Sequence, residues 1–173
     1  MILGGVLVGG SSRRMGRDKA TLRVQGRALA EIAEDALRPH CEVVHRLGPP
    51  GLADVPNICG PLAGIMAAQR HDPEAWWVIV ACDMPLLQPE AIAWLLEQRT
   101  AGVVAVIPRT PDGHVQPTCA LYGPGVGGLL GQVTAPSQLA TRPHVVVPKI
   151  PPMLAPQWTN VNDPEALKRV SLS

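Results

Sequence analysis

The sequence has very few aromatic side chains: it contains no Phe, one Tyr and four Trp among 173 residues. Proteins that bind single-stranded nucleic acids commonly stack the bases on several aromatic rings. Lysine and arginine together number 15 against 14 acidic residues, which leaves a formal net charge of +1. Such a balanced chain has no broad positive field to hold a nucleic acid backbone or an anionic bilayer. The composition therefore disfavours nucleic acid as a partner.

The chain also lacks any apolar run of the roughly 18 residues that a membrane-spanning helix requires. The apolar stretch at residues 2–8 has no basic leader and is followed by glycines and arginines, which is not the pattern of a signal peptide. The four cysteines, Cys41, Cys59, Cys82 and Cys119, include no CxxC pair, so we expect buried free thiols and no structural zinc site. These features predict no membrane partner and a reducing, cytoplasmic location.

What the sequence does contain is an alternation of short runs rich in Val and Ile with segments of helical periodicity. This alternation is typical of a three-layer α/β fold, in which a mostly parallel sheet is flanked by helices. At 173 residues the chain is expected to form one domain over 1–173. Strands are predicted at 2–8, 42–47, 76–82, 103–107, 116–122 and 145–147, and helices at 29–38, 61–71, from Pro89 onward and at 164–170, with weak helical patterns at 124–132 and 136–141.

The first predicted strand leads into a segment, residues 9–19, that carries glycines, three arginines and a lysine. Adjacent glycines such as Gly9 and Gly10 let backbone amides converge on an anion, and cationic side chains such as Lys19 add charge-assisted hydrogen bonds. The spacing matches neither the GxGxxG fingerprint nor the P-loop motif. We interpret the segment as a phosphate-binding loop; the alternative is a plain turn with solvated arginines.

Asp83 follows the most continuously apolar run, residues 76–82, and is therefore expected at the carboxyl end of a central strand. A carboxylate at this place is costly unless its charge is compensated, and a Mg²⁺ ion that bridges it to nucleotide phosphates would compensate it. The alternative is an acid that serves a turn. Together with the cationic loop, Asp83 predicts a phosphate and metal site.

These motifs resemble those of the molybdenum cofactor guanylyltransferases, a MobA-like family of nucleoside-triphosphate transferases. The family pattern Leu-Ala-Gly-Gly-x-Ser-x-Arg-Met-Gly-x-Asp-Lys is reproduced at residues 7–19, with Val8 in place of alanine. The resemblance covers most of the chain. Four further segments match the family in order: 60–64, 82–85, 116–118 and 160–165.

The resemblance implies a Rossmann-like nucleotidyltransferase fold and assigns the first motif to the nucleotide. Leu7, Val8, Gly9 and Gly10 would hold the nucleotide through their backbone groups. Lys19 would neutralise its phosphates. Both catalysis and nucleotide binding are thereby expected to depend on this loop.

The resemblance also assigns the later motifs. Asp83 would bind Mg²⁺ beside the nucleotide, while Gly60 and Gly64 would pass close to the base and ribose. Asn160 and Asn162 would line the end of the site that receives molybdopterin. The alternatives are structural: the two glycines would serve a helix start and tight helix packing, and the two asparagines would satisfy the backbone of a turn.

The implied reaction is transfer of GMP from GTP to the terminal phosphate of molybdopterin, which releases pyrophosphate and forms molybdopterin guanine dinucleotide. The implied partners are GTP and molybdopterin, followed by molybdoenzyme apoproteins and cofactor-insertion proteins. The acidic residue that the family often uses to recognise guanine has two imperfect candidates here, Asp54 and Asn57. A cytidylyltransferase acting with CTP, a nucleotide-sugar pyrophosphorylase of the same fold and a non-catalytic carrier of nucleotide or cofactor stay open as alternatives.

Overall fold

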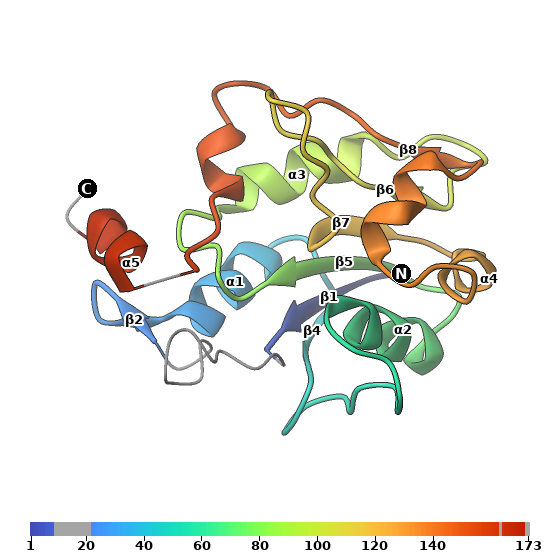
Figure 1. Cartoon of the computed structure of the whole chain (residues 1–173), viewed down its shortest axis with the longest axis horizontal. Helices are drawn as coiled ribbons and strands as arrows, with labels where there is room; N and C mark the ends of the chain where they lie inside the picture. Colours follow the sequence, from blue (N-terminus) through green and yellow to red (C-terminus); the bar gives the residue numbers. More distant parts are fainter. Residues whose placement is uncertain (9–21, 163, 172–173) are drawn as a thin grey trace.

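A computed structural model of the chain describes residues 1–8, 22–162 and 164–171. Its main feature is a six-stranded sheet with the strand order β4-β1-β5-β7-β6-β8 (Figure 1). A separate two-stranded hairpin, β2 (Arg23–Val24) and β3 (Arg27–Ala28), follows the first strand in the chain. The strands of the main sheet are β1 (Ile2–Leu7), β4 (Val43–Leu47), β5 (Trp76–Ala81), β6 (Ala105–Val106), β7 (Cys119–Tyr122) and β8 (Val145–Val146).

Helices cover both faces of the sheet, which gives the three layers expected from the sequence (Figure 1). One face packs against α1 (Leu29–Leu37) and α3 (Pro89–Glu97). The other face packs against α2 (Pro61–His71), the short helix α4 (Gly127–Leu130) and the 3₁₀ helix η2 (Pro136–Thr141). The chain then forms the 3₁₀ helix η3 (Ala155–Trp158) and the C-terminal helix α5 (Pro164–Ser171).

The central strand β5 shows why its sequence is apolar without interruption. Val78 and Val80 belong to the core cluster on the side of α1 and α3, and Trp77 and Ile79 belong to the cluster on the side of α2. All four side chains are completely buried. Successive side chains of a strand point to opposite faces, so a strand covered on both faces requires an apolar residue at every position.

The sheet is mostly parallel, as predicted, with one exception. Strands β4, β1 and β5 run parallel to one another, and β8 runs parallel to β6, whereas β7 is antiparallel to both of its neighbours. The strand predicted at 116–122 begins at Cys119 only. Pro117 has no N–H to donate, and the backbone N–H of Gln116 donates to the carbonyl of Pro108 at 2.7 Å, in a loop outside the strand pairing.

The cysteines differ in part from the expectation of buried thiols. Cys82 and Cys119 are buried and Cys41 is half-buried, but Cys59 is exposed. Cys59 lies in the connection between β4 and α2. Such connections run over protein surfaces, so a cysteine in one of them need not be buried. Within the described part of the chain, no helix is long and apolar enough to cross a membrane.

Candidate active site

The first part of the site is the carboxyl edge of the three parallel strands. Leu7 at the end of β1 pairs with Leu47 of β4 on one side and with Ala81 of β5 on the other. The edge continues beyond the strands, because the backbone N–H of Val8 donates to the carbonyl of Leu47 at 3.0 Å and that of Cys82 donates to the carbonyl of Leu7 at 3.3 Å. The end of the first motif and the approach to Asp83 are therefore adjacent in space.

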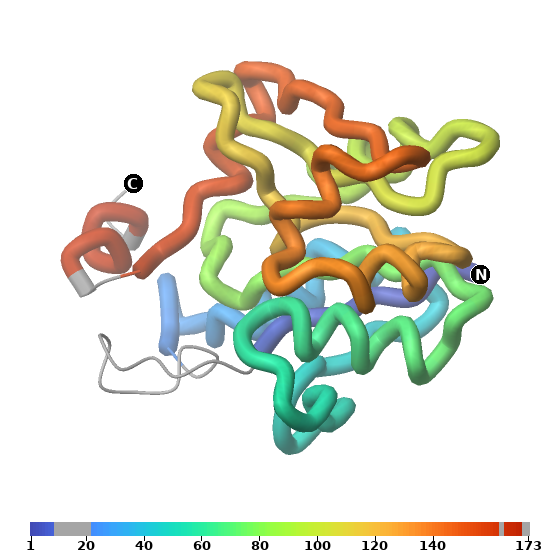
Figure 2. Tube along the Cα trace, turned by 45° about the vertical axis from the view of Figure 1, so that its right-hand side comes forward, coloured from blue at the N-terminus to red at the C-terminus, as the bar shows by residue number. Residues whose placement is uncertain are grey.

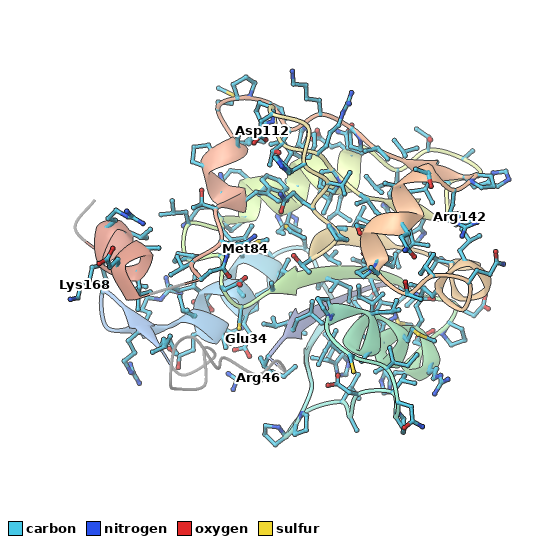
Figure 3. All side chains as sticks on the ribbon, in the orientation of Figure 1. Glu34, Arg46, Met84, Asp112, Arg142 and Lys168 are labelled. Atoms are coloured by element: carbon cyan, nitrogen blue, oxygen red, sulfur yellow. The ribbon has the colours of Figure 1, made fainter. Side chains whose placement is uncertain are left out.

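Asp83 lies in the turn that follows β5, two residues past the end of the strand. Met84 beside it is 1% exposed and anchors the turn in the core, at the end of β5 where Figure 3 labels it. Asp83 itself is half-buried, and its Oδ1 is buried from solvent. The strand thus ends by placing a carboxylate at the carboxyl edge of the sheet, as the sequence predicts.

A segment distant in the sequence, residues 160–162, is held against Asp83. The backbone N–H of Val161 donates to the carbonyl of Asp83 at 2.8 Å, and the Val161 side chain is completely buried. Figure 2 shows this red segment running past the green connection between β5 and α3 before it reaches α5. The structure therefore brings together two of the predicted site segments.

The two predicted asparagines flank Val161 and differ in exposure. Asn162 is exposed, whereas Asn160 is half-buried. The side-chain oxygen Oδ1 of Asn160 is buried and accepts no hydrogen bond within the described residues. A buried amide oxygen normally finds a donor, so this atom is available to a ligand or ion that the site takes up.

Gly60 and Gly64 lie at the start of α2, and the structure shows a local reason for each. Gly60 precedes Pro61 with a φ of +69°, a conformation that glycine adopts without steric cost. A Cβ on Gly64 would stand 2.5 Å from Cδ2 of Leu7, so the missing side chain lets α2 lie close to β1. The structural alternative thus accounts for both glycines, and a role in nucleotide binding stays a prediction.

The amino end of α2 nevertheless points to the same edge of the sheet as Asp83. Strands β4 and β5 are both parallel to β1, so the helix that connects them begins at the carboxyl edge and ends at the amino edge. The free N–H groups and the dipole at a helix amino end favour anions. Asp54, one of the two candidates for reading the base, lies beside α2: its Oδ1 is 3.7 Å from the place of a Cβ on Gly64.

Asp83 and Asn160 carry the type of oxygen ligand that a Mg²⁺ ion shared with a substrate requires. Mg²⁺ prefers oxygen ligands and is usually held by one or two carboxylates, substrate phosphates and water. Asp83 supplies one carboxylate, and Asn160 on the neighbouring segment supplies an amide oxygen. In the part of the chain that the structure describes, no cluster of three or more His, Cys, Asp or Glu side chains could form a metal cage. These residues fit an ion bound together with phosphates better than a permanent metal site.

Three predicted residues, Gly9, Gly10 and Lys19, lie outside the described residues. Their roles stay predictions. Leu7 and Val8, which precede them, do lie at the carboxyl edge as described above. The edge to which the loop is attached is therefore known, and it is the edge that carries Asp83.

Sequence reasoning assigned no role to Thr118, which the structure places next to the end of β5. The carbonyl of Thr118 accepts a hydrogen bond of 2.7 Å from the backbone N–H of Ala81, two residues before Asp83. The only indication in the sequence was that segment 116–118 matches the family, and this match assigned no role to Thr118. The neighbouring Cys119 is buried, and burial raises the pKa of its thiol, so this cysteine stays protonated and is unsuited to act as a nucleophile.

The sequence matches a family model and several known proteins. The family model for the MobA-like NTP transferase domain matches residues 4–142. A Bacillus subtilis protein named as a probable molybdenum cofactor guanylyltransferase is 36% identical over 131 residues, which cover 68% of this chain and 64% of the relative. A Synechocystis protein named as a bifunctional molybdenum cofactor biosynthesis protein is 32% identical over 136 residues, covering 71% of this chain but 39% of the relative. The match thus spans less than two thirds of the length of either relative.

A solved structure extends the similarity to nearly the whole chain. The crystal structure of molybdopterin-guanine dinucleotide biosynthesis protein A from Archaeoglobus fulgidus superposes with a TM-score of 0.80 at 26% identity, covering 98% of this chain and 97% of the other. The matched residues 4–142 include most of β1 together with Gly60, Gly64 and Asp83, and the superposition covers nearly the whole chain. The chain belongs to the MobA-like NTP transferase family.

Proposed function

We propose that this chain is a single nucleotidyltransferase domain that transfers GMP from GTP to the terminal phosphate of molybdopterin. The observation that carries the proposal is the contact between Asp83 and residues 160–162 beyond the carboxyl end of β5. The backbone N–H of Val161 donates a hydrogen bond to the carbonyl of Asp83 in this contact. Both segments match family motifs, and a relative named as a probable molybdenum cofactor guanylyltransferase is 36% identical over 131 residues. The enzyme would act in the cytoplasm and hand its product to molybdoenzyme apoproteins or to cofactor-insertion proteins.

The reaction is a displacement at the α-phosphorus of GTP. A terminal phosphate oxygen of molybdopterin forms the new P–O bond, the bond from the α-phosphorus to the oxygen that bridges it to the β-phosphate breaks, and pyrophosphate leaves. No covalent enzyme intermediate is required. The protein contributes mainly positioning of the two phosphates and stabilisation of the charge that develops between them.

Each half of the site has a separate task. On the nucleotide side, Leu7 and Val8 at the sheet edge, with Gly9 and Gly10 after them, bind the nucleotide through backbone groups, and Lys19 neutralises its phosphates. These roles follow from the family resemblance and from the place of β1 in the sheet. Gly64 keeps the start of α2 close to β1, and Gly60 adds no side chain there, so that the base and ribose would fit against the helix end.

Asp83 would bind Mg²⁺ beside the nucleotide, and Asn160 provides an amide oxygen on the acceptor side. Bound Mg²⁺ would neutralise charge on the phosphates in this position. Asn160 and Asn162 would orient molybdopterin, since they lie on the segment hydrogen-bonded to Asp83. The buried oxygen of Asn160 is suited to accept a hydrogen bond from an N–H group or to contact the ion.

Nucleotide binding by calorimetry tests the proposal most directly. GTP, CTP, ATP and UTP are compared with and without Mg²⁺, and Mg²⁺-dependent preference for GTP is expected. Formation of the guanine dinucleotide from GTP and molybdopterin is then assayed. Preference for CTP would change the assigned activity from guanylyltransferase to cytidylyltransferase. Failure to bind any of the four nucleotides would overturn the proposed site.

The variant Asp83→Asn separates catalysis from binding. The change keeps the shape of the side chain and removes the charge, so we expect turnover to fall by about 10²–10³-fold, as when an electrostatic group is removed from an active site, while GTP binding weakens far less. The matched control is Glu97→Gln, the same chemical change at an exposed position at the far end of α3. Equal activity of Asp83→Asn and the wild type would contradict the assignment.

A further inference from the structure

A third, smaller apolar cluster lies outside the two cores that cover the sheet. It joins three elements: the hairpin β2–β3, the start of α1 and the C-terminal helix α5. We call this cluster the clasp. Its members are the buried Val24, Leu29 and Ile32 and the partly buried Leu22, Leu167 and Val170.

One side of the clasp is the chain that leaves the predicted phosphate loop. Leu22 is the first described residue after the loop, and its carbonyl accepts a hydrogen bond of 2.8 Å from the backbone N–H of Leu29. The side chain of Glu31 accepts a hydrogen bond of 3.0 Å from the backbone N–H of Ala28 and closes the hairpin onto α1. The exit from the nucleotide half of the site is thereby fixed to the first helix.

The other side of the clasp is the helix that follows the acceptor segment. Val161 is fixed to Asp83 by its backbone hydrogen bond, and α5 begins at Pro164, two residues after Asn162. Figure 1 shows α5 beside β2, away from the helices that cover the sheet. The helix therefore connects the predicted acceptor residues to the hairpin that follows the predicted nucleotide loop.

The contact of α5 with the clasp depends on one face of a short helix. Leu167 and Val170 are spaced three residues apart and so share a face, which is the face that packs on the clasp. Lys168 and Arg169 are exposed, and Figure 3 shows Lys168 pointing outward. A helix of this length is marginal in water without packing, so α5 depends on the clasp for its own structure.

We propose that Leu167 and Val170 are positioning residues that hold the acceptor segment in place relative to the hairpin β2–β3 and the start of α1. The inference rests on the proposed function, since it concerns the same site. Val161 fixes the segment at Asp83, and the clasp fixes the helix that follows it, so Asn162 lies between the two anchors and Asn160 directly precedes the first. Loss of the second anchor leaves the acceptor residues free to move relative to the nucleotide, and small misplacements of reacting groups reduce rates strongly.

The double variant Leu167→Ala with Val170→Ala tests the proposal by steady-state kinetics and hydrogen exchange. We expect kcat/KM for molybdopterin at saturating GTP to fall by about tenfold or more, as for a misplaced reactant, and amide exchange at residues 22–28 to accelerate. GTP affinity should change much less. Lys168→Ala, on the exposed face of α5, and the conservative Leu167→Met should both behave like the wild type.

The outcomes separate this inference from the proposed function. Exchange at residues 22–28 needs no turnover, so it decides whether α5 anchors the hairpin even if the wild type binds no GTP. Unchanged exchange and unchanged kcat/KM in the double variant would overturn the clasp. A loss of activity that Lys168→Ala shares, or that Leu167→Met fails to avoid, would overturn the positioning role as well.

Discussion

Gly64 shows how one missing side chain determines the distance between α2 and the strand that carries the first motif. A Cβ at this position would lie 2.5 Å from Cδ2 of Leu7 and 3.4 Å from Cβ of Leu47. Both leucines are buried, so Gly64→Ala forces the helix or the leucines to shift. Overpacking of this kind costs about 1–3 kcal/mol, against a gain in helix propensity of up to about 1 kcal/mol. We expect a net loss of unfolding free energy in urea titrations.

The matched control for this substitution is Gly127→Ala in α4. A Cβ on Gly127 would meet no atom within 4 Å, so the variant gains helix propensity without a clash and is expected to be neutral or slightly stabilised. Equal destabilisation of the two variants would mean that the contact with Leu7 does not limit the approach of α2. Because Leu7 borders the predicted nucleotide site, Gly64→Ala is also expected to weaken GTP binding, whereas Gly127→Ala is not.

At the residue level, the sequence predicted the place of Asp83 at the end of a central strand. It did not predict how the burial of Asn160 and Asn162 differs. An acid directly after a buried apolar run has to emerge at the strand end, and this argument needs no tertiary information. The contact between Val161 and Asp83 joins segments far apart in the chain, and hydrophobic periodicity, which reports only local structure, does not predict it. The difference between the buried oxygen of Asn160 and the exposed Asn162 depends on that contact, so it required the structure.

Among the elements, α1 is tied to β4 by a carboxylate between two arginines. The Nε of Arg46 donates to Oε1 of Glu34 at 2.5 Å, and Arg38 lies 3.7 Å from the other oxygen; Figure 3 labels Glu34 and Arg46 close together at this junction. The Glu34 side chain is 14% exposed, and its hydrogen bond raises the pKa of Arg46. Glu34→Gln is therefore expected to lower the unfolding free energy by roughly 1–2 kcal/mol, since hydrogen bonds to charged groups exceed neutral ones.

Asp35, the next residue of the same helix, provides the comparison for Glu34. It pairs with Arg27 and Arg38, but its side chain is 42% exposed. Exposed ion pairs contribute little and are screened by salt, so Asp35→Asn should change stability less than Glu34→Gln in urea titrations at low salt. A larger loss of unfolding free energy for Asp35→Asn than for Glu34→Gln would show that solvent exposure does not determine how much each carboxylate stabilises the fold.

Most elements were predictable because their patterns are local. The helix Pro61–His71 has a proline at its start and was predicted with the observed bounds. The hairpin β2–β3 was not predicted, because each strand has two residues and its turn uses Gln25 at φ +50° and Gly26 at φ +81°. Hairpin turns of this kind are usually recognised by Asn-Gly or Asp-Gly, and Gln in the first position does not carry that signal.

At the scale of the whole molecule, the order of the strands explains why the site lies beside β1 and β5. From β1 the chain passes through α1 on one face to β4, and from β4 it returns through α2 on the opposite face to β5. The connections that follow β1 and β4 thus lie on opposite faces of the sheet, and ligands of such sheets usually lie outside the carboxyl ends of the strands, which is the edge that carries Asp83. Sequence alternation predicted the layers, but the reversed strand β7 and the strand order could not be derived from it.

The buried ionisable groups also predict how the whole molecule responds to alkaline pH. Burial raises the pKa of the Cys41 thiol from 9.0 to about 12, and burial raises the pKa of Cys119 and of Tyr122 as well. Above the pH at which thiols ionise in the unfolded chain, the unfolded state has lost protons that the folded state still holds, so stability falls as pH rises from about 9 towards 12.

Each such thiol contributes a slope of roughly 1.4 kcal/mol per pH unit in that window. Urea titrations between about pH 8 and 10.5 should therefore show a constant unfolding free energy up to about pH 9 and a steep decline beyond it. Cys41→Ala removes one of the thiols whose pKa is raised by burial and should make the decline shallower, whereas substitution of the exposed Cys59 by Ser should leave it unchanged. An unfolding free energy that stays flat through pH 10 would show that these thiols ionise as readily in the folded protein as in the unfolded chain.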